Sequence, residues 1–161
     1  MRLSGPTLVV FVLAVVPAAA QTATATLSAN LGGLAKLSFS TNSISFPDAN
    51  PDIVPLVPAS PGPIVITAKT RSAAGGTVTL TVQASDVLRS GLDTIPASAI
   101  TWTTSGPGYV AGTLSSTAPQ LVGSWTGSGV HIGTQNYLLH NLWTYPTGTY
   151  SVSLLYTLSS Q

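Results

Sequence analysis

The sequence predicts an all-β protein, an antiparallel β-sandwich of two sheets with about eight strands. Val, Thr, Ile and Leu, which favour strands, are abundant along the whole chain. Gly and Pro interrupt them about every ten residues, as turns between short strands do. No stretch keeps the 3.6-residue periodicity of an amphipathic helix.

The opening segment, MRLSGPTLVVFVLAVVPAAA (residues 1–20), predicts a secretory signal peptide. One positive charge precedes an uncharged apolar run, and the segment ends on three alanines. The run is shorter than the ~20 residues that a membrane-spanning helix needs. We therefore expect cleavage before Gln21, no membrane insertion afterwards, and one domain over residues 21–161. The protein would be secreted through the periplasm to the cell surface or the extracellular space.

The next segment, TATATLSANL (residues 22–31), alternates between small or apolar and polar side chains. One face would carry Ala23, Ala25, Leu27, Ala29 and Leu31. This pattern predicts either the first strand of the domain or an N-terminal extension (residues 21–33) that inserts into another copy. The intramolecular strand is the preferred explanation, because three alanines bury little surface.

The strands that follow are short and are separated by turn residues. LAKLSFS and SISF predict two of them, and the six prolines of residues 47–63 predict a long ordered loop or an edge crossing. Residues 63–70 (PIVITAKT) and 77–84 (TVTLTVQA) both alternate, and we expect them to pair as a hairpin across the turn at residues 72–76.

The second half of the chain predicts the remaining strands. IPASAITWTT and YVAGTLSS should form a hairpin around the Gly106-Pro107-Gly108 turn, and QLVGSW and TQNYLLHNLW add two strands. The last, PTGTYSVSLLYTL (residues 146–158), should close the sandwich. Its apolar face comprises Tyr150, Val152, Leu154, Tyr156 and Leu158.

Charge and cysteine content restrict the partners of this chain. Without the charge in the signal peptide, four Lys and Arg balance four Asp, and Glu and Cys are absent. So few charges argue against nucleic acid and anionic lipid as partners. A net charge near zero favours association between copies, so the expected partner is either another copy, in a homopolymer, or another surface protein. Without Cys, the core alone must stabilise the fold.

The side chains that catalysis needs are scarce. A serine hydrolase needs a His base and an orienting carboxylate, but only His131 and His140 are present and no G-x-S-x-G elbow accompanies them. A glycosidase needs two facing carboxylates, and the four Asp lie in a loop or near strand ends. We therefore predict that the protein is not an enzyme, with a secreted hydrolase as the most distant alternative.

Asp48, Asn50 and Asp52 have the D-x-N-x-D spacing with which a loop surrounds Ca²⁺. The sixth position of such a loop is Ile53 here in place of Gly, and the twelfth is Ala59 in place of Glu. Turn capping around a proline is therefore the preferred explanation, and a weak calcium site is the alternative.

Aromatic residues gather in the C-terminal half of the chain. If the rings of Trp125, Tyr109 and Tyr145 were exposed in one plane, they would stack on sugars and indicate a carbohydrate-binding module. The preferred alternative is that Trp102 and Trp143 fill the core and that the tyrosines close strand ends.

The Gly-Thr-Tyr at residues 148–150 and the alternating strand after it resemble the C-terminal strand of bacterial fimbrial subunits, including the spore coat U type of chaperone-usher pilin. The stretch from Leu37 to Trp102, with SISF, VTLTVQASD and IPASAITW, is similar to secreted surface proteins of the WxL-like sort. The pilin resemblance implies an immunoglobulin-like sandwich that lacks one strand and receives the N-terminal extension of the next copy. The expected function is therefore a non-catalytic structural or adhesive one at the cell surface, such as a pilus or fibre subunit.

Overall fold

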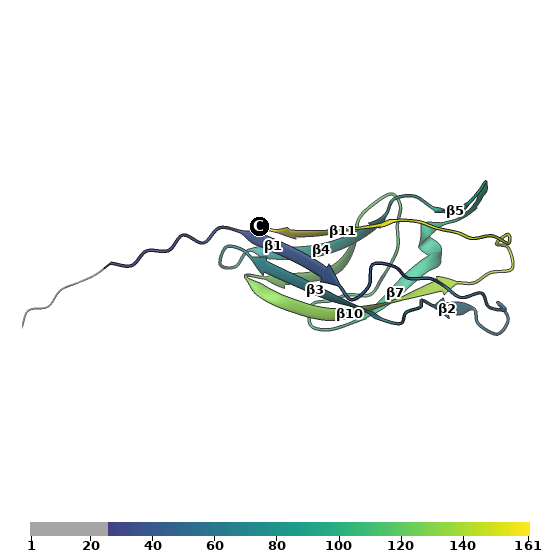
Figure 1. Ribbon diagram of the computed structural model, residues 1–161, viewed down its shortest axis with the longest axis horizontal. Helices are drawn as coiled ribbons and strands as arrows, with labels where there is room; N and C mark the ends of the chain where they lie inside the picture. Colours follow the sequence, from purple (N-terminus) through teal and green to yellow (C-terminus); the bar gives the residue numbers. More distant parts are fainter. Residues whose placement is uncertain (1–25) are drawn as a thin grey trace, which may run out of the picture. The chain divides into compact units, whose positions relative to one another are not determined.

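The computed structural model describes residues 26–161 and confirms an all-β sandwich of antiparallel sheets (Figure 1). Within these residues the chain forms eleven strands and one short 3₁₀-helix. A compact unit spans Leu31–Gln161. The predicted signal peptide, and Ala23 and Ala25 of the predicted alternating segment, lie outside the described residues.

The larger sheet is built around the twelve-residue strand β10 (Gly129–His140). Its other strands are β1 (Leu34–Phe39), β2 (Leu56–Pro58), β3 (Ile64–Arg71), β7 (Ile100–Ser105) and β8 (Gly112–Thr113). Strand β10 pairs with β3 and then β2 along one edge and with β7 along the other, and β1 continues the sheet beyond β3.

The smaller sheet has the order β11-β4-β9. Its strands are β11 (Leu154–Ser160), β4 (Thr77–Ala84) and β9 (Gln120–Thr126). A separate two-stranded hairpin, β5 (Leu88–Ser90) and β6 (Asp93–Ile95), leads through the 3₁₀-helix η1 (Ala97–Ala99) into β7.

The core lies between the sheets and is made by alternate residues of each strand. In β3 and β4 every second side chain is buried, as the period of two predicts. The largest buried side chain is Trp102, whose indole N–H donates to the carbonyl of Val110 at 2.9 Å. Gly112 makes this packing possible, because a Cβ there would lie 2.5 Å from the Trp102 ring.

The predicted hairpin of residues 63–70 and 77–84 is wrong. Strands β3 and β4 lie in different sheets, and residues 72–76 cross between them. Alternation shows that each strand has one buried face, but a hairpin and a crossing satisfy that pattern equally well. The second predicted hairpin is confirmed, because β7 pairs with β8 through Thr101 and Thr113.

Several predicted strands are shorter in the structure than in the sequence pattern; YVAGTLSS, for example, contributes only β8. SISF is reduced to a single bridge between Ser45 and Ser60, and β11 begins at Leu154 rather than near residue 146. The partner strand β4 ends at Ala84, opposite Leu154, so the residues before Leu154 have no continuous ladder partner. The predicted inward face of this segment is confirmed, since residues 150, 152, 154, 156 and 158 pack against the core.

The predicted intramolecular first strand is absent from the described part of the alternating segment. Residues 26–33 are exposed and carry no strand, and the first strand begins at Leu34. Leu27 is 98 % exposed and Leu31 is 72 % exposed. The proline-rich stretch behaves as predicted, because it contributes only the short strand β2 at the edge of β10.

Candidate functional site

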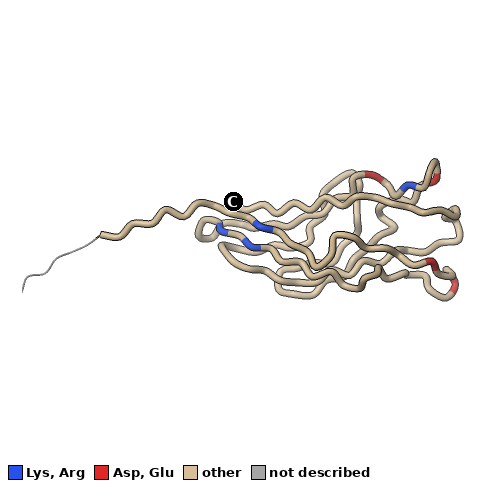
Figure 2. Tube along the Cα trace, in the orientation of Figure 1, with Lys and Arg blue, Asp and Glu red and all other residues tan. Residues whose placement is uncertain are grey.

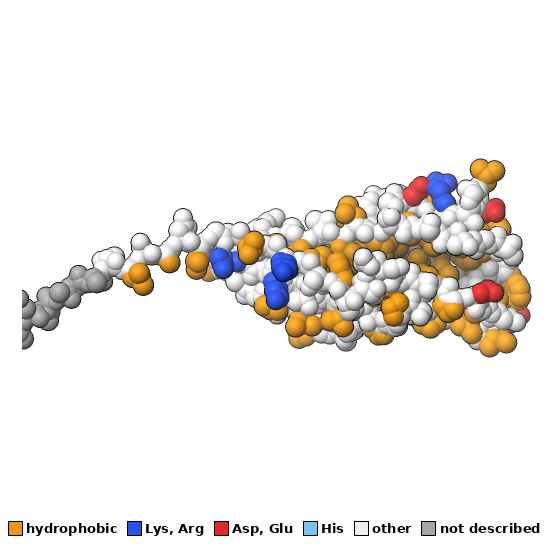
Figure 3. All heavy atoms as spheres, in the orientation of Figure 1, with side chains coloured by type: hydrophobic (Ala, Val, Ile, Leu, Met, Phe, Trp, Pro, Cys, Tyr) orange, Lys and Arg blue, Asp and Glu red, His pale blue; other side chains and the backbone are white. Residues whose placement is uncertain are grey.

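A groove of about 1200 Å³ opens between the two sheets at one end of the sandwich. Residues 41–49, which follow β1, form one wall, and residues 141–154, which lead into β11, form the other. Figure 3 shows hydrophobic side chains in the hollow between two largely white bands. The buried residues reached from the groove are Val57, Ile64, Leu88, Ile95, Ile100 and Tyr137.

The strands nearest to this groove, β1 and β11, are the edges of their sheets. Before β11, the backbone of Ser151 exchanges hydrogen bonds with Arg89, and Ser153 accepts one from Ser85. Backbone groups alternate in direction along a strand, so those of Val152 and Leu154 point to the side away from Ser85 and Arg89. An unpaired strand edge of this kind is a template for a further strand.

A chain of hydrogen bonds connects the groove to the core. The hydroxyls of Tyr137 and Tyr156 lie 2.6 Å apart, and the Tyr156 hydroxyl donates to Gln135 Oε1 at 2.7 Å. Gln135 is 0 % exposed, and its Nε2 has no protein partner. Burial raises the pKa of Tyr156 to about 12 and raises that of Tyr137 further. Both hydroxyls therefore stay protonated near neutral pH. The hydrogen bonds among Tyr137, Tyr156 and Gln135 form an uncharged network.

The described lining of the groove contains one carboxylate, Asp48, and no Lys, Arg or His. It offers apolar contact surface and unpaired backbone, with no neighbouring base and nucleophile. Of the two histidines, His131 lies at the start of β10 and His140 at its end, and neither lines the groove. The groove therefore offers apolar side chains and backbone groups for contact.

The predicted calcium residues lie in a loop at the same end of the sandwich. Asn50 Oδ1 accepts from the backbone N–H of Asp52 at 2.9 Å, and Asp52 Oδ1 accepts from the indole N–H of Trp143 at 3.0 Å. Asp48 lines the groove. Asn50 thus caps its own turn, which favours turn capping, whereas Asp52 contacts a residue distant in the chain. Within residues 26–161, no three His, Cys, Asp or Glu residues are grouped as a metal site would require.

The rings predicted to stack on sugars do not form a common surface. Trp125 and Tyr109 are buried; their ring centroids are 4.9 Å apart, and His131 stacks on Trp125 with a centroid distance of 4.5 Å. Tyr145 lies at the other end of the sandwich, where it is partly buried and lines the groove.

The position of Trp143 corrects the expectation that Trp102 and Trp143 both fill the core. Trp102 does so, but Trp143 is 68 % exposed at the rim of the groove. It follows the end of β10, where no strand holds its side chain against the core. The sequence signal for this exposure was the polar and proline-containing run TYPTGT directly after it.

The predicted strand-exchange residues that the structure describes are Leu27, Ala29 and Leu31, and all three are exposed. The residues that sequence reasoning missed are those of the groove walls, such as Ile44, Phe46 and Val152. The sequence signal for these residues was strand-like alternation in segments that have no continuous partner strand.

A scan of protein-family models, a search of curated proteins and a search of solved structures each gave no match for this chain. The resemblance to fimbrial and WxL-like proteins therefore stays a prediction. Within the described part of the chain, no helix has the length and apolarity that a membrane crossing requires.

Proposed function

We propose that this protein is a non-catalytic, exported structural or adhesive subunit, whose groove receives the N-terminal extension of another copy to build a fibre at the cell surface. The supporting observation is the largely apolar groove where the edge strands β1 and β11 end and begin, together with an alternating segment whose described residues, 26–33, form no strand. The predicted signal peptide supports export.

The extension has the side-chain pattern that this groove requires. A strand inserted between the groove walls, residues 41–49 and 141–154, would turn every second side chain towards the core and pair its backbone with an unpaired edge. Leu27 and Leu31 belong to one face of the extension and are exposed without a partner. Burying each of them would contribute about 1.5–3 kcal/mol. The alanines between them add less, so the two leucines should dominate the affinity.

The test is assembly of the mature protein, followed by size-exclusion chromatography with light scattering over a range of concentrations. We expect wild type to form a ladder of oligomers and Leu27→Asp to stay monomeric, because the new carboxylate would face the apolar floor. Ser28→Asp is the matched control, since it places the same charge on the opposite face and should assemble. Wild type that remains monomeric at every concentration would refute assembly by exchange.

A peptide of residues 21–33 tests the groove separately from assembly. We expect it to raise the Tm of the Leu27→Asp protein, because a ligand specific to the folded state stabilises that state. The same peptide with Asp in place of Leu27 should leave the Tm unchanged. Equal responses to both peptides would exclude the groove as the binding site of the extension.

Carbohydrate binding is the second candidate function. Trp143 is the observation that favours it, because this exposed ring lies at the groove rim close in sequence to Tyr145. A glycan array compares wild type with Trp143→Ala, and Trp125→Phe is the control for a ring buried elsewhere. A glycan retained by wild type and by the control, but not by Trp143→Ala, would support a sugar site at the rim; no retained glycan on wild type would reject it.

A further inference from the structure

Charged residues are concentrated at the two ends of the sandwich, mostly cationic at one end and mostly acidic at the other (Figure 2). The cationic end is defined by Lys36, Lys69 and Arg71, on strands β1 and β3. The acidic end is defined by four Asp residues and one Arg in the loops and the β5–β6 hairpin at the opposite end: Asp48, Asp52, Asp86, Arg89 and Asp93. These eight are all the Lys, Arg and Asp side chains within residues 26–161.

The three cationic side chains of the cationic end lie close together and repel one another. Lys36 and Lys69 are direct partners in the β1–β3 ladder, and Arg71 lies two residues further along β3. Like charges directly opposite each other destabilise a strand pair. Within the described residues, no carboxylate forms an ion pair with any of the three. This arrangement suits a face that meets negative charge from another molecule.

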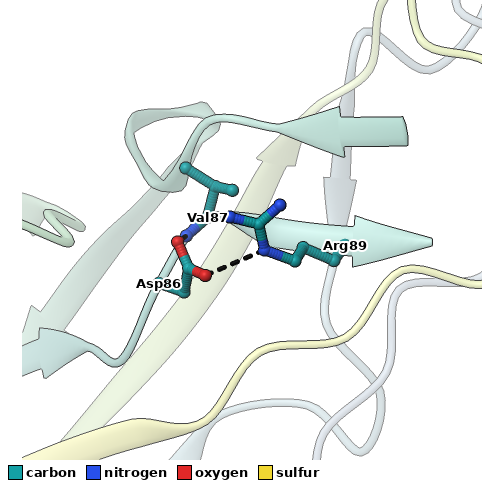
Figure 4. Close-up of polar contacts among 3 residues, drawn as sticks. All are labelled: Asp86, Val87 and Arg89. Carbon is teal, nitrogen blue, oxygen red and sulfur yellow. Dashed lines mark hydrogen bonds and ion pairs between the residues drawn. The ribbon is translucent and has the colours of Figure 1, made fainter. Parts of the chain in front are cut away.

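The acidic end retains uncompensated negative charge. Arg89 Nε forms an ion pair with Asp86 Oδ2 at 2.8 Å, and this hydrogen bond lowers the pKa of Asp86 (Figure 4). Asp48, Asp52 and Asp93 make no ion pair within the described residues. All three therefore contribute negative charge at this end.

The acidic end is also the mouth of the groove. Asp48 lines the groove, and Asp52 accepts a hydrogen bond from the rim residue Trp143. Asp93 pairs with Ser90 in the β5–β6 hairpin, and Ser90 lies against Gly148 of the groove wall. A partner that enters the groove would therefore meet these carboxylates.

The two charged ends are far apart along β10. Lys69 is opposite Val130 near the start of this strand, whereas Asn141, just past its end, donates to the carbonyl of Ala49 beside Asp48. Eleven residues of extended strand separate Val130 from Asn141, or about 36 Å at ~3.3 Å per residue. This distance exceeds the Debye length of about 8 Å at physiological salt. Each end therefore presents its own charge to a partner.

We propose that successive copies join with the cationic end of one against the acidic end of the next, which fixes the direction in which the extension enters the groove. The extension precedes β1, and Gly33 lies beside the backbone of Arg71 at the cationic end. If residues 31–33 lie at the groove mouth, the incoming cationic end meets the acidic end. Insertion in the reverse direction would bring two cationic ends together. The inserted strand therefore runs antiparallel to β11.

This inference rests on the proposed function, and charge reversal tests it apart from that function. One variant carries Lys36→Glu and Lys69→Glu, and the other carries Asp48→Lys and Asp93→Lys; all four positions are exposed. Each variant alone should stay monomeric where wild type assembles, because every junction joins like charges. An equimolar mixture should assemble as an alternating copolymer, because both kinds of junction are complementary again.

Two controls make the result specific. Thr103→Glu, an exposed position near the middle of the larger sheet, should assemble as wild type does. The peptide of residues 21–33 should raise the Tm of both reversed variants, which shows that their folds and grooves are intact.

Raising the salt concentration should slow wild-type assembly about tenfold, as expected when charge steers association.

Cysteine cross-linking reports the direction of insertion. Because the chain has no native Cys, Asn30→Cys combined with Thr149→Cys should form a disulfide between copies at the groove mouth when a mild oxidant is added to accept the two electrons. Thr26→Cys with Thr149→Cys is the matched control, since residues 26 and 30 share a face but lie about 13 Å apart along a strand. Stronger cross-linking from residue 26 would overturn the proposed direction.

The outcomes separate the two proposals. If both reversed variants assemble alone, or if their mixture stays monomeric while wild type assembles, the charged junction is refuted and exchange through the groove stands. If wild type does not assemble and the peptide does not bind, the proposed function fails and this inference fails with it.

Discussion

The hydrogen-bonded chain of Tyr137, Tyr156 and Gln135 gives the sharpest stability prediction. Tyr156→Phe removes the hydroxyl that contacts Tyr137 and donates to Gln135, and changes little else in volume. Neither the oxygen nor the nitrogen of the Gln135 side-chain amide would then have a hydrogen-bond partner in the protein. The Tyr137 hydroxyl would also lose its partner.

The expected cost follows from the burial of these groups. A buried polar group left without a partner costs about 1–3 kcal/mol, so two such groups should lower the free energy of unfolding by about 3 kcal/mol. For a domain of this size, about 3 °C is lost per kcal/mol, which corresponds to a fall in Tm of about 9 °C. Urea unfolding and calorimetry of the Leu27→Asp protein measure it on a monomeric background.

The double variant Gln135→Leu with Tyr156→Phe decides whether the hydrogen bonds are the cause. Replacing both partners by apolar groups removes the unsatisfied atoms, so stability should return to within about 1 kcal/mol of the background. Tyr150→Phe is the control, because that hydroxyl donates to the Pro146 carbonyl in an exposed loop and its loss should leave the Tm unchanged. A Tyr156→Phe protein as stable as the background would refute the reasoning.

Three further predictions concern burial. Burial lowers the pKa of His131 from 6.5, so the unfolded state binds more protons and stability should fall as the pH drops below that value; His131→Asn should reduce this dependence in thermal melts. Gly123→Ala places a Cβ 2.4 Å from an indole ring and should cost about 1–3 kcal/mol in urea unfolding, whereas Gly62→Ala meets no atom within 4 Å. Leu80→Ala, at a fully buried position, should cost about 2–5 kcal/mol, and Leu92→Ala, at a fully exposed hairpin tip, less than about 0.5 kcal/mol.

Each of these three has an outcome that would contradict it. A pH dependence that His131→Asn leaves unchanged would place the titrating group elsewhere. Equal stability of the two glycine variants would mean that the indole ring moves aside without cost. Similar losses from the two leucine variants would contradict the placement of β4 in the core.

Strand faces were the part of the fold that alternation predicted well. The buried positions of β3 and β4 and the inward row from residue 150 to 158 follow the period of two in the sequence. This information is local, because successive side chains of any strand point to opposite faces whatever its neighbours are. The contact of Asn50 with the backbone of Asp52 is also local, because the two residues are only two positions apart in one turn.

Strand partners were not predictable in the same way. The β3–β4 crossing and the exposed Trp143 depend on which edges and surfaces the rest of the chain supplies. The pattern of the predicted strand at residues 146–158 continues beyond its ladder with β4, and the residues before Leu154 form part of one wall of the groove. No single segment contains that information.

The sequence by itself therefore determined the all-β class, the faces of the strands and the shortage of catalytic side chains, because each follows from local periodicity or from composition. Only the tertiary structure decided which strands pair, where the sheets part to form the groove, and that Lys36 faces Lys69 at the end opposite to the carboxylates. The physical reason is that pairing and register are set by contacts between segments distant in the chain, and many pairings satisfy the same alternation.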